Sequence, residues 1–159
     1  MNDVNDLKNI AKGVYYRLKG DCIFCKMVEQ NKKEKIVYQN ENVAVFPPLK
    51  KDVLAEGHLL VIPKKHYENI FDIPEDELKE VTHASKKIAE KLEEDEELEG
   101  VNILHASGKE AQQSVNHFHI HLVPRRKSED LDLWPETEYT EERFTENYSR
   151  IRESLEALK

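Results

Sequence analysis

Hydrophobic residues along the chain change from helix-like to strand-like spacing several times. Over residues 3–19 they recur every three or four positions, which predicts an amphipathic helix that ends at Gly20. The same spacing predicts a long helix beginning at 72–74 and a final helix beginning at Thr140. Pro74 suits the first turn of a helix, because its missing N–H costs no helical hydrogen bond there.

Five shorter apolar runs have the length and composition of β-strands. They lie at 35–38, 43–46, 58–62, 101–105 and 117–123. A polar, Asn-rich gap joins the first two runs as a hairpin, and proline follows the second and third. We therefore expect an α+β fold, with a five-stranded, largely antiparallel sheet and helices packed on one side or at the ends.

The run at 117–123 carries the most informative pattern. His117, His119 and His121 occupy alternate positions, with apolar residues between them. Successive side chains on a strand point to opposite faces, so the three imidazoles are expected to share one face. Packing explains the apolar face but gives no reason for three imidazoles in a row. Imidazole is both a metal ligand and a nucleophile, so this face predicts a zinc site or a catalytic site.

Length and composition narrow the protein class. A chain of 159 residues without repeats fits one domain with a real core. With 32 acidic and 24 basic residues the formal net charge is −8, so general nucleic-acid binding is not expected, although a local patch could hold one phosphate. No apolar run approaches the roughly 20 residues of a membrane span. The N-terminus lacks the apolar core of a secretory signal, so we expect a cytoplasmic protein.

Cysteine usage adds a second candidate site. The chain has two cysteines, Cys22 and Cys25. In a reducing compartment this two-residue spacing favours metal or redox chemistry over a structural disulfide. Without further ligands, two small buried residues remain an equally good reading.

Several blocks together resemble the histidine triad (HIT) superfamily of nucleotide hydrolases and transferases. The blocks are CIFCK at 22–26, GHLLVIPKKH at 57–66, Asn102, and QSVNHFHIHLVP at 113–124. The resemblance implies a HIT domain over 21–126, an N-terminal helical extension at 1–20, and a C-terminal loop and helix at 127–159. It also implies a homodimer in which two five-stranded sheets join into one of ten strands.

The resemblance implies a catalytic role for the histidines. His119 would attack the α-phosphorus of a nucleotide and form a covalent nucleotidyl-histidine that water then hydrolyses. The main-chain carbonyl of His117 would hold the other ring N–H of His119, and His121 would hold phosphate oxygens or protonate the leaving group. The implied substrates are nucleoside phosphoramidates or dinucleoside polyphosphates, cleaved to a nucleoside monophosphate. The alternative is a non-catalytic, zinc-stabilised nucleotide-binding or interaction protein of the same fold.

Further positions match the family's substrate contacts. The Ser114 hydroxyl and the backbone N–H groups of Gln113 and Ser114 would bind the developing negative charge, and Gly108 would allow a tight loop near the phosphate. Positions that line the family's purine pocket are apolar here and could equally be core residues: Ile23, Phe24, Met27, Phe46 and Leu49.

Three positions depart from the family pattern. Pro48 stands where an acidic residue usually binds the ribose, and Asp52 in the following loop could substitute for it. Ala106 replaces an amide, and Gln112 replaces a glycine, in the phosphate loop. These changes put the substrate in question. Pro48 and Ala106 favour the binding-protein alternative, whereas the complete triad of histidines argues against it.

Zinc is a separate implication of the resemblance. Some family members bind a structural Zn²⁺ through positions that are here Cys22, Cys25, His66 and His117. Two thiolates and two imidazoles are a typical closed, tetrahedral structural set. For the other histidines, His58 is either a partner of the triad or a core residue, and His83 and His105 are interpreted as structural. Trp134 could cap the nucleotide pocket or lie in the core or the dimer interface.

Overall fold

The structure, a computed structural model, describes residues 21–158 with four internal gaps. The gaps are residues 31–33, 97, 128–130 and 135–137. The helix expected over 3–19 lies outside the described residues. Within the described part of the chain, no helix is both long and apolar enough to cross a membrane.

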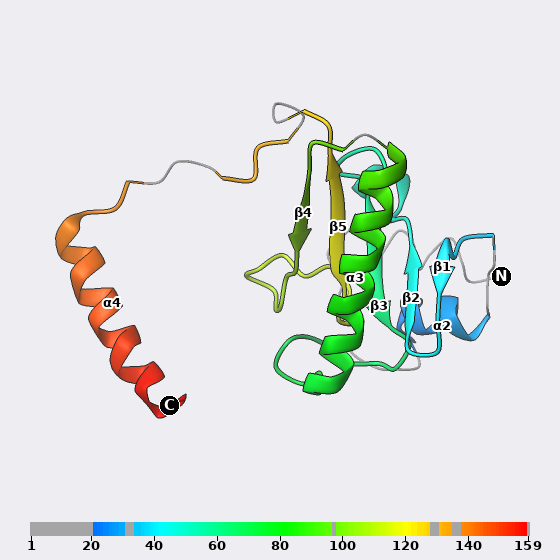
Figure 1. The fold of residues 1–159 in the computed structure, drawn as a ribbon. Helices are drawn as coiled ribbons and strands as arrows, with labels where there is room; N and C mark the ends of the chain where they lie inside the picture. The colour runs from blue at the N-terminus through cyan, green and yellow to red at the C-terminus, as the bar shows by residue number, and fades with distance from the viewer. Residues whose placement is uncertain (1–20, 31–33, 97, 128–130, 135–137, 159) are drawn as a thin grey trace.

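A five-stranded antiparallel sheet forms the body of the molecule (Figure 1). Its strands are β1 (Tyr38–Gln39), β2 (Val43–Phe46), β3 (Leu59–Pro63), β4 (Gly100–Leu104) and β5 (Ile120–Arg125), in the spatial order β1-β2-β3-β5-β4. The hairpin between β1 and β2 forms because the Asn40 side-chain oxygen accepts the N–H groups of Asn42 and Val43 at 2.9 and 2.8 Å. The α+β sheet expected from the sequence is confirmed.

Helices cover the two faces of the sheet differently. The long helix α3 (Glu75–Glu96) packs across one face, and the short α2 (Ile23–Glu29) lies against the other (Figure 1). Two short 3₁₀ turns, Lys50–Asp52 and Glu156–Leu158, complete the described elements. Each face has its own buried cluster. Val81 of α3 packs with Val61 and Leu122 on one face, and Phe24 of α2 packs with Phe46 on the other.

The histidine-bearing strand begins three residues later than the sequence suggests. The main chain of 117–119 bonds to loops instead of to a neighbouring strand: His117 N–H donates to Val115 and Phe118 N–H donates to Tyr67. The strand is therefore β5 (Ile120–Arg125), and the first strand likewise contains only Tyr38–Gln39. The alternation of faces still extends back to residue 117, because Phe118 belongs to the α3-side cluster together with Ile120.

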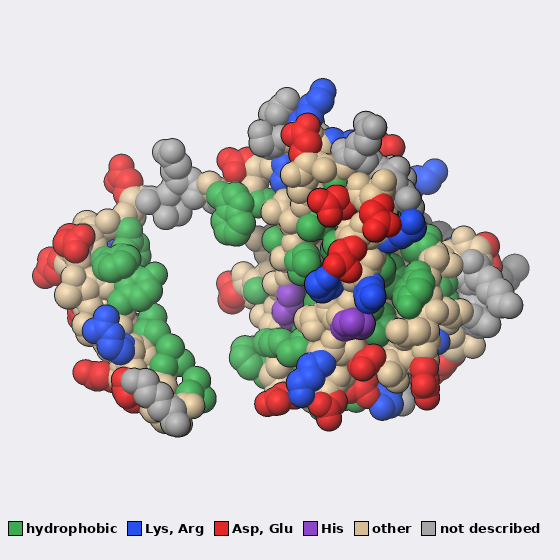
Figure 2. All heavy atoms as spheres, viewed as in Figure 1, with side chains coloured by type: hydrophobic (Ala, Val, Ile, Leu, Met, Phe, Trp, Pro, Cys, Tyr) green, Lys and Arg blue, Asp and Glu red, His purple; other side chains and the backbone are tan. Residues whose placement is uncertain are grey.

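The C-terminal helix stands apart from the body. Helix α4 (Glu141–Leu155) begins after Thr140, whose side-chain oxygen accepts the Arg143 N–H at 3.4 Å, as expected of a helix cap. Its apolar face points toward the open space beside the body (Figure 2). The large side chains of that face are about half exposed, and they are Phe144, Tyr148, Ile151 and Leu155.

Candidate active site and metal centre

The sheet face opposite α3 gathers four histidines side by side. His58 comes just before β3, His117 and His119 come just before β5, and His121 lies in β5. The ring centroids of His119 and His121 are 4.9 Å apart, and those of His58 and His121 are 5.2 Å apart. The structure thus brings together the triad predicted from the alternating pattern, with His58 in direct contact with it.

His119 is buried and its ring is fixed by main chain. Its Nδ1 lies 2.7 Å from the carbonyl oxygen of His117, the contact that the family resemblance implies. A carbonyl oxygen only accepts, so Nδ1 carries a hydrogen and donates it. The other ring nitrogen, Nε2, therefore keeps its lone pair in the neutral ring, as a nucleophile requires.

A hydrogen bond from His58 likewise determines which ring nitrogen of His121 carries the hydrogen. The Leu54 N–H donates to Nδ1 of His58 at 3.1 Å, so the hydrogen of the neutral His58 ring lies on Nε2. That Nε2 lies 3.0 Å from Nδ1 of His121 and donates to it. The hydrogen of His121 consequently lies on its own Nε2, where it can donate a hydrogen bond to a phosphate oxygen.

Burial keeps these rings neutral. Loss of hydration lowers the pKa of His119 to about 4, and the neighbouring His121 and His105 rings oppose its charged form further. The pKa values of His58 and His121 are each lowered to about 4, again mainly by burial. At neutral pH the site therefore holds neutral imidazoles, with a lone pair on Nε2 of His119 and a hydrogen on Nε2 of His121.

These lowered pKa values predict a loss of stability in mild acid. In the unfolded chain these histidines become protonated as the pH falls through about 6.5. In the folded chain they stay neutral until the pH nears 4. The stabilisation is thus complete above the unfolded pKa and is lost as the pH falls toward the folded one. Each such histidine adds about 1.4 kcal/mol per pH unit to the slope in this window. Urea unfolding between pH 7.5 and 5 measures that slope, and His121→Gln should reduce it. A free energy of unfolding that stays constant over this range would contradict the prediction.

The loop before the triad is held by Gln113. The side-chain oxygen of Gln113 accepts the Gly108 N–H at 2.7 Å, and its amide nitrogen donates to the carbonyls of Glu68 and Val115 at 2.6 and 3.0 Å. Gly108 adopts a φ of +89°, as a tight turn there requires, and Gln112 adopts +63°. The family's glycine at position 112 is thus replaced without loss of the left-handed backbone, at a cost of about 1–2 kcal/mol.

One predicted phosphate contact is revised by this geometry. The backbone N–H of Gln113 already donates to the carbonyl of Gly108 at 3.1 Å, so it is not presented to a ligand. Gln113 is buried and shapes the loop, whereas Ser114 is exposed. Of the two residues, the exposed Ser114 stays the predicted phosphate-binding group.

The predicted purine-pocket residues divide into two sets. Phe24 and Phe46 are buried, at 7% and 1% exposure, with their rings edge-to-face at 5.2 Å. Phe24 also lies edge-on to the ring of His119 at 5.5 Å, so it packs against the triad. Ile23 and Met27 are partly exposed, and Leu49 is 36% exposed.

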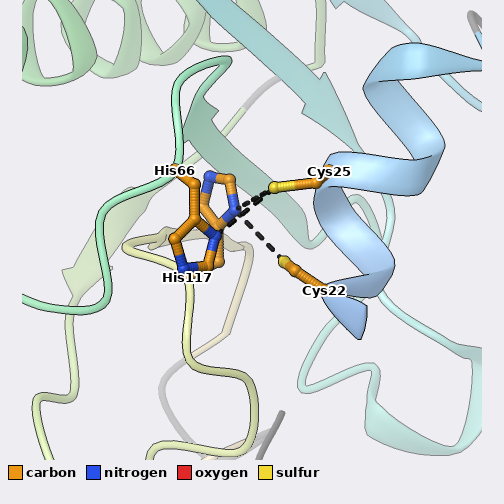
Figure 3. Close-up of side chains that lie close together, drawn as sticks. All are labelled: Cys22, Cys25, His66 and His117. Carbon is orange, nitrogen blue, oxygen red and sulfur yellow. Dashed lines mark hydrogen bonds between the residues drawn. The ribbon is translucent and has the colours of Figure 1, made fainter. Parts of the chain in front are cut away.

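Cys22, Cys25, His66 and His117 form a second cluster beside the triad (Figure 3). The sulfur atoms of Cys22 and Cys25 lie 3.3 and 3.6 Å from Nδ1 of His117, and Cys25 lies 3.3 Å from Nδ1 of His66. Ligands bound to one tetrahedral Zn²⁺ by bonds of about 2.0 and 2.3 Å lie about 3.5 Å apart. The cluster therefore has the donor types and the spacing that fit zinc.

His117 is oriented toward the cluster by the end of β3. Its Nε2–H donates to the carbonyl of Pro63 at 2.8 Å, so the Nδ1 lone pair faces the two sulfur atoms. Burial raises the pKa of the Cys22 thiol, because it disfavours the charged thiolate. A coordinated cation would reverse this effect by binding the thiolate. His117 thus links the two sites, with its ring at the metal cluster and its carbonyl holding His119.

Comparison with known proteins agrees with this geometry. The family model described as HIT domain matches residues 29–128. The chain belongs to the HIT domain family. It is 38% identical to Protein hit of Bacillus subtilis over 105 residues, which is 66% of this chain and 71% of that protein. It is 32% identical over 142 residues to the adenosine 5'-monophosphoramidase HNT1 of Candida albicans, covering 84% of this chain and 91% of that one.

A solved HIT structure bears on the metal cluster. The Zn-bound histidine triad family protein of Mycobacterium smegmatis superposes with a TM-score of 0.66 at 30% identity, covering 76% of this chain and 86% of that one. That relative binds zinc on the same fold, and the Cys/His cluster of this chain is a candidate metal site.

Sequence reasoning missed one residue that contacts the HIT triad. Nδ1 of His105 lies 2.8 Å from the carbonyl oxygen of His119. From the sequence alone, His105, at the end of a predicted strand, has a structural interpretation. His105 directly precedes Ala106, one of the positions that differ from the family pattern. This was the only feature of the sequence that pointed to a role for it.

Proposed function

We propose that this HIT protein is a nucleotide hydrolase that works through a covalent nucleotidyl-His119 intermediate. The observation that carries the proposal is the buried His119 ring, whose Nδ1–H is held by the His117 carbonyl at 2.7 Å. This contact orients Nε2 and stabilises the positive charge that the ring gains when Nε2 forms a bond.

The reaction is written in two balanced steps. Nε2 of His119 attacks the α-phosphorus, the bond from phosphorus to the leaving group breaks, and the leaving group takes a proton from water while the Nε2–H of neutral His121 donates a hydrogen bond to a phosphate oxygen. Water then attacks the same phosphorus, the bond from phosphorus to His119 breaks, the proton that this water loses goes to the solvent, and a nucleoside monophosphate is released. The exposed Ser114 hydroxyl supports the phosphate oxygens during both steps.

The substrate class we propose is a nucleoside phosphoramidate or a dinucleoside polyphosphate. The adenosine 5'-monophosphoramidase of Candida albicans, at 32% identity, supports the first of these. Partly exposed Ile23, Met27 and Leu49 would contact the base, because Phe24 and Phe46 are buried behind the histidines. Bound Zn²⁺ would serve the fold by holding His117. Its two cysteine ligands must remain reduced, which agrees with the cytoplasm expected from the sequence.

A homodimer remains a prediction that two exposed features support. Strand β4 is an edge strand, and its Val101 and Ile103 are 37% and 52% exposed. Unpaired edges of this kind are templates for pairing with a second chain. The apolar face of α4 points to the open space beside β4 and would cover part of a partner placed there (Figures 1 and 2).

The proposal is tested with adenosine phosphoramidate and diadenosine tetraphosphate. We expect adenosine monophosphate to be released, and a rapid acid-free quench followed by peptide mass spectrometry to find one adenylyl group on His119. Binding of both compounds without turnover would overturn the enzyme and favour the non-catalytic binding protein. The binding-protein alternative is supported by Ala106 and half-buried Pro48, which stand where the family has contacts with the nucleotide.

A further inference from the structure

Strands β4 and β5 separate next to the proposed nucleophile. The last residues paired between them are Leu104 and His121. After Leu104 the chain turns into the 106–113 loop, while His119 lies just before β5 begins. The carbonyl of His119 therefore lies beyond the end of the β4–β5 ladder, although the neighbouring Ile120 is still paired with Val61 of β3.

The His105 side chain contacts the His119 carbonyl. Its Nδ1 lies 2.8 Å from the His119 carbonyl oxygen, and its Nε2 lies 2.6 Å from Oγ of Ser107. The carbonyl can only accept, so Nδ1–H donates, and the Ser107 hydroxyl can give its hydrogen to Nε2. Ser107 Oγ in turn accepts the backbone N–H of Ile70 at 3.0 Å. Three bonds with one consistent direction thus run from the Ile70 main chain to the His119 main chain.

The His105 ring cannot rotate out of this line easily. It stacks on Phe118 with ring centroids 4.3 Å apart and an angle of 30° between the planes, and Phe118 is 1% exposed in the core. One ring face is therefore fixed by packing and both ring nitrogens are fixed by hydrogen bonds. The same ring joins the loop that contains Gly108 to the residue proposed to attack phosphorus.

We infer that His105 is a positioning residue for His119. The inference rests on the proposed function: the Nδ1 contact with His117 sets the rotation of the His119 ring, and His105 sets the main chain that carries this ring. Because reacting atoms must approach to about 3–3.5 Å in the correct line, a small shift of this main chain costs rate more than it costs binding. Loss of the His105 contact should therefore lower kcat with little change in KM.

Two variants separate the hydrogen bond from the packing of the ring. His105→Phe keeps an aromatic ring against Phe118 but removes both hydrogen bonds. His105→Asn removes the ring but can place an amide N–H near the Nδ1 position and donate to His119. Turnover of adenosine phosphoramidate should fall on the order of 10²-fold in His105→Phe, with KM within about threefold, and His105→Asn should recover most of the loss. His83→Phe, at an exposed position of α3, is the matched control and should behave as the wild type.

The order of the two variants decides the inference. If His105 only fills space, Phe is tolerated and Asn is not, which is the reverse of the order expected here. Wild-type kcat in His105→Phe, or equal impairment of both variants, would also overturn it. Melting curves of both variants show whether each is folded, and Ser107→Ala, which leaves His105 in place, should give a smaller loss of kcat in the same direction.

A second readout keeps this inference separate from the proposed activity. Long-range ¹H–¹⁵N spectra of histidine-labelled protein report the ring nitrogens of His119, identified by their absence in His119→Asn. His105→Phe should shift or broaden these signals, and His105→Asn should restore them toward their wild-type positions. If no variant and no wild-type protein turns over substrate, the proposed function fails, and this spectrum still decides whether His105 positions His119. An unchanged His119 spectrum in His105→Phe would overturn the inference.

Discussion

Replacing His119 by alanine is expected to reduce adenosine monophosphate release by a factor on the order of 10⁴ or more, because it removes the proposed nucleophile itself. Substrate binding should change little, because the His119 ring is only 2% exposed and most contacts with the substrate would be made by neighbouring residues. Steady-state turnover, with nucleotide binding measured by calorimetry, checks both statements. The loss should appear in kcat and should be accompanied by disappearance of the adenylyl adduct.

His119→Asn is the sharper variant of this experiment. An asparagine amide can still donate to the His117 carbonyl from near the Nδ1 position, but it has no atom at the position of Nε2. We expect the variant to keep the fold and to be as inactive as His119→Ala. His83→Ala, which removes an exposed histidine of α3, should retain full turnover. Turnover that survives in both His119 variants, or an adduct found on another residue, would remove His119 from the mechanism.

Local sequence patterns were sufficient for most of the fold. The run 43–46 became β2 without change, because four consecutive apolar residues between an Asn-rich turn and two prolines leave few other choices. The apolar spacing that predicted the long helix also marks the side of α3 that packs on the sheet, where Val81 and Ala84 are buried. Strand ends were less predictable. The strand beginning at Ile120 was placed too early because 117–119 have strand-like alternation but bond to loops.

In the candidate site, too, features set by neighbouring residues could be predicted from the sequence, whereas features set by residues distant in sequence could not. Alternation placed the three histidines on one face, which is a property of neighbouring residues. The proton positions depend on distant main chain instead: Leu54 fixes His58, and Pro63 fixes His117. The backbone N–H of Gln113 was expected to bind phosphate but donates to the Gly108 carbonyl, and its side chain bonds Glu68 and Gly108, which come together only in the folded chain. The role of His105 was hidden for the same reason.

Removing metal from the Cys22, Cys25, His66 and His117 cluster should lower stability substantially. A ligand that binds only the folded chain adds about 4 kcal/mol when its free concentration is 1,000 times its Kd. For a chain of this size that corresponds to a fall in Tm of roughly 8–16 °C. We expect stoichiometric zinc by elemental analysis of protein never exposed to chelator, and a fall of this size in the melting curve after chelation. A pocket of about 390 Å³ is lined by two residues of the cluster, Cys25 and His66, together with Lys64, Lys65 and the acidic Glu29.

Cys25→Ser separates loss of metal from loss of packing. In zinc-loaded protein the substitution should lower Tm nearly as far as chelation does, whereas in chelated protein it should cost little, because Ser and Cys differ little in size. Equal costs with and without zinc, or protein that carries no zinc when first purified, would contradict the metal assignment. Turnover should fall with the metal but by less than in His119→Ala. The Pro63 carbonyl still holds the His117 ring when zinc is absent, so the carbonyl that orients His119 is loosened and not removed.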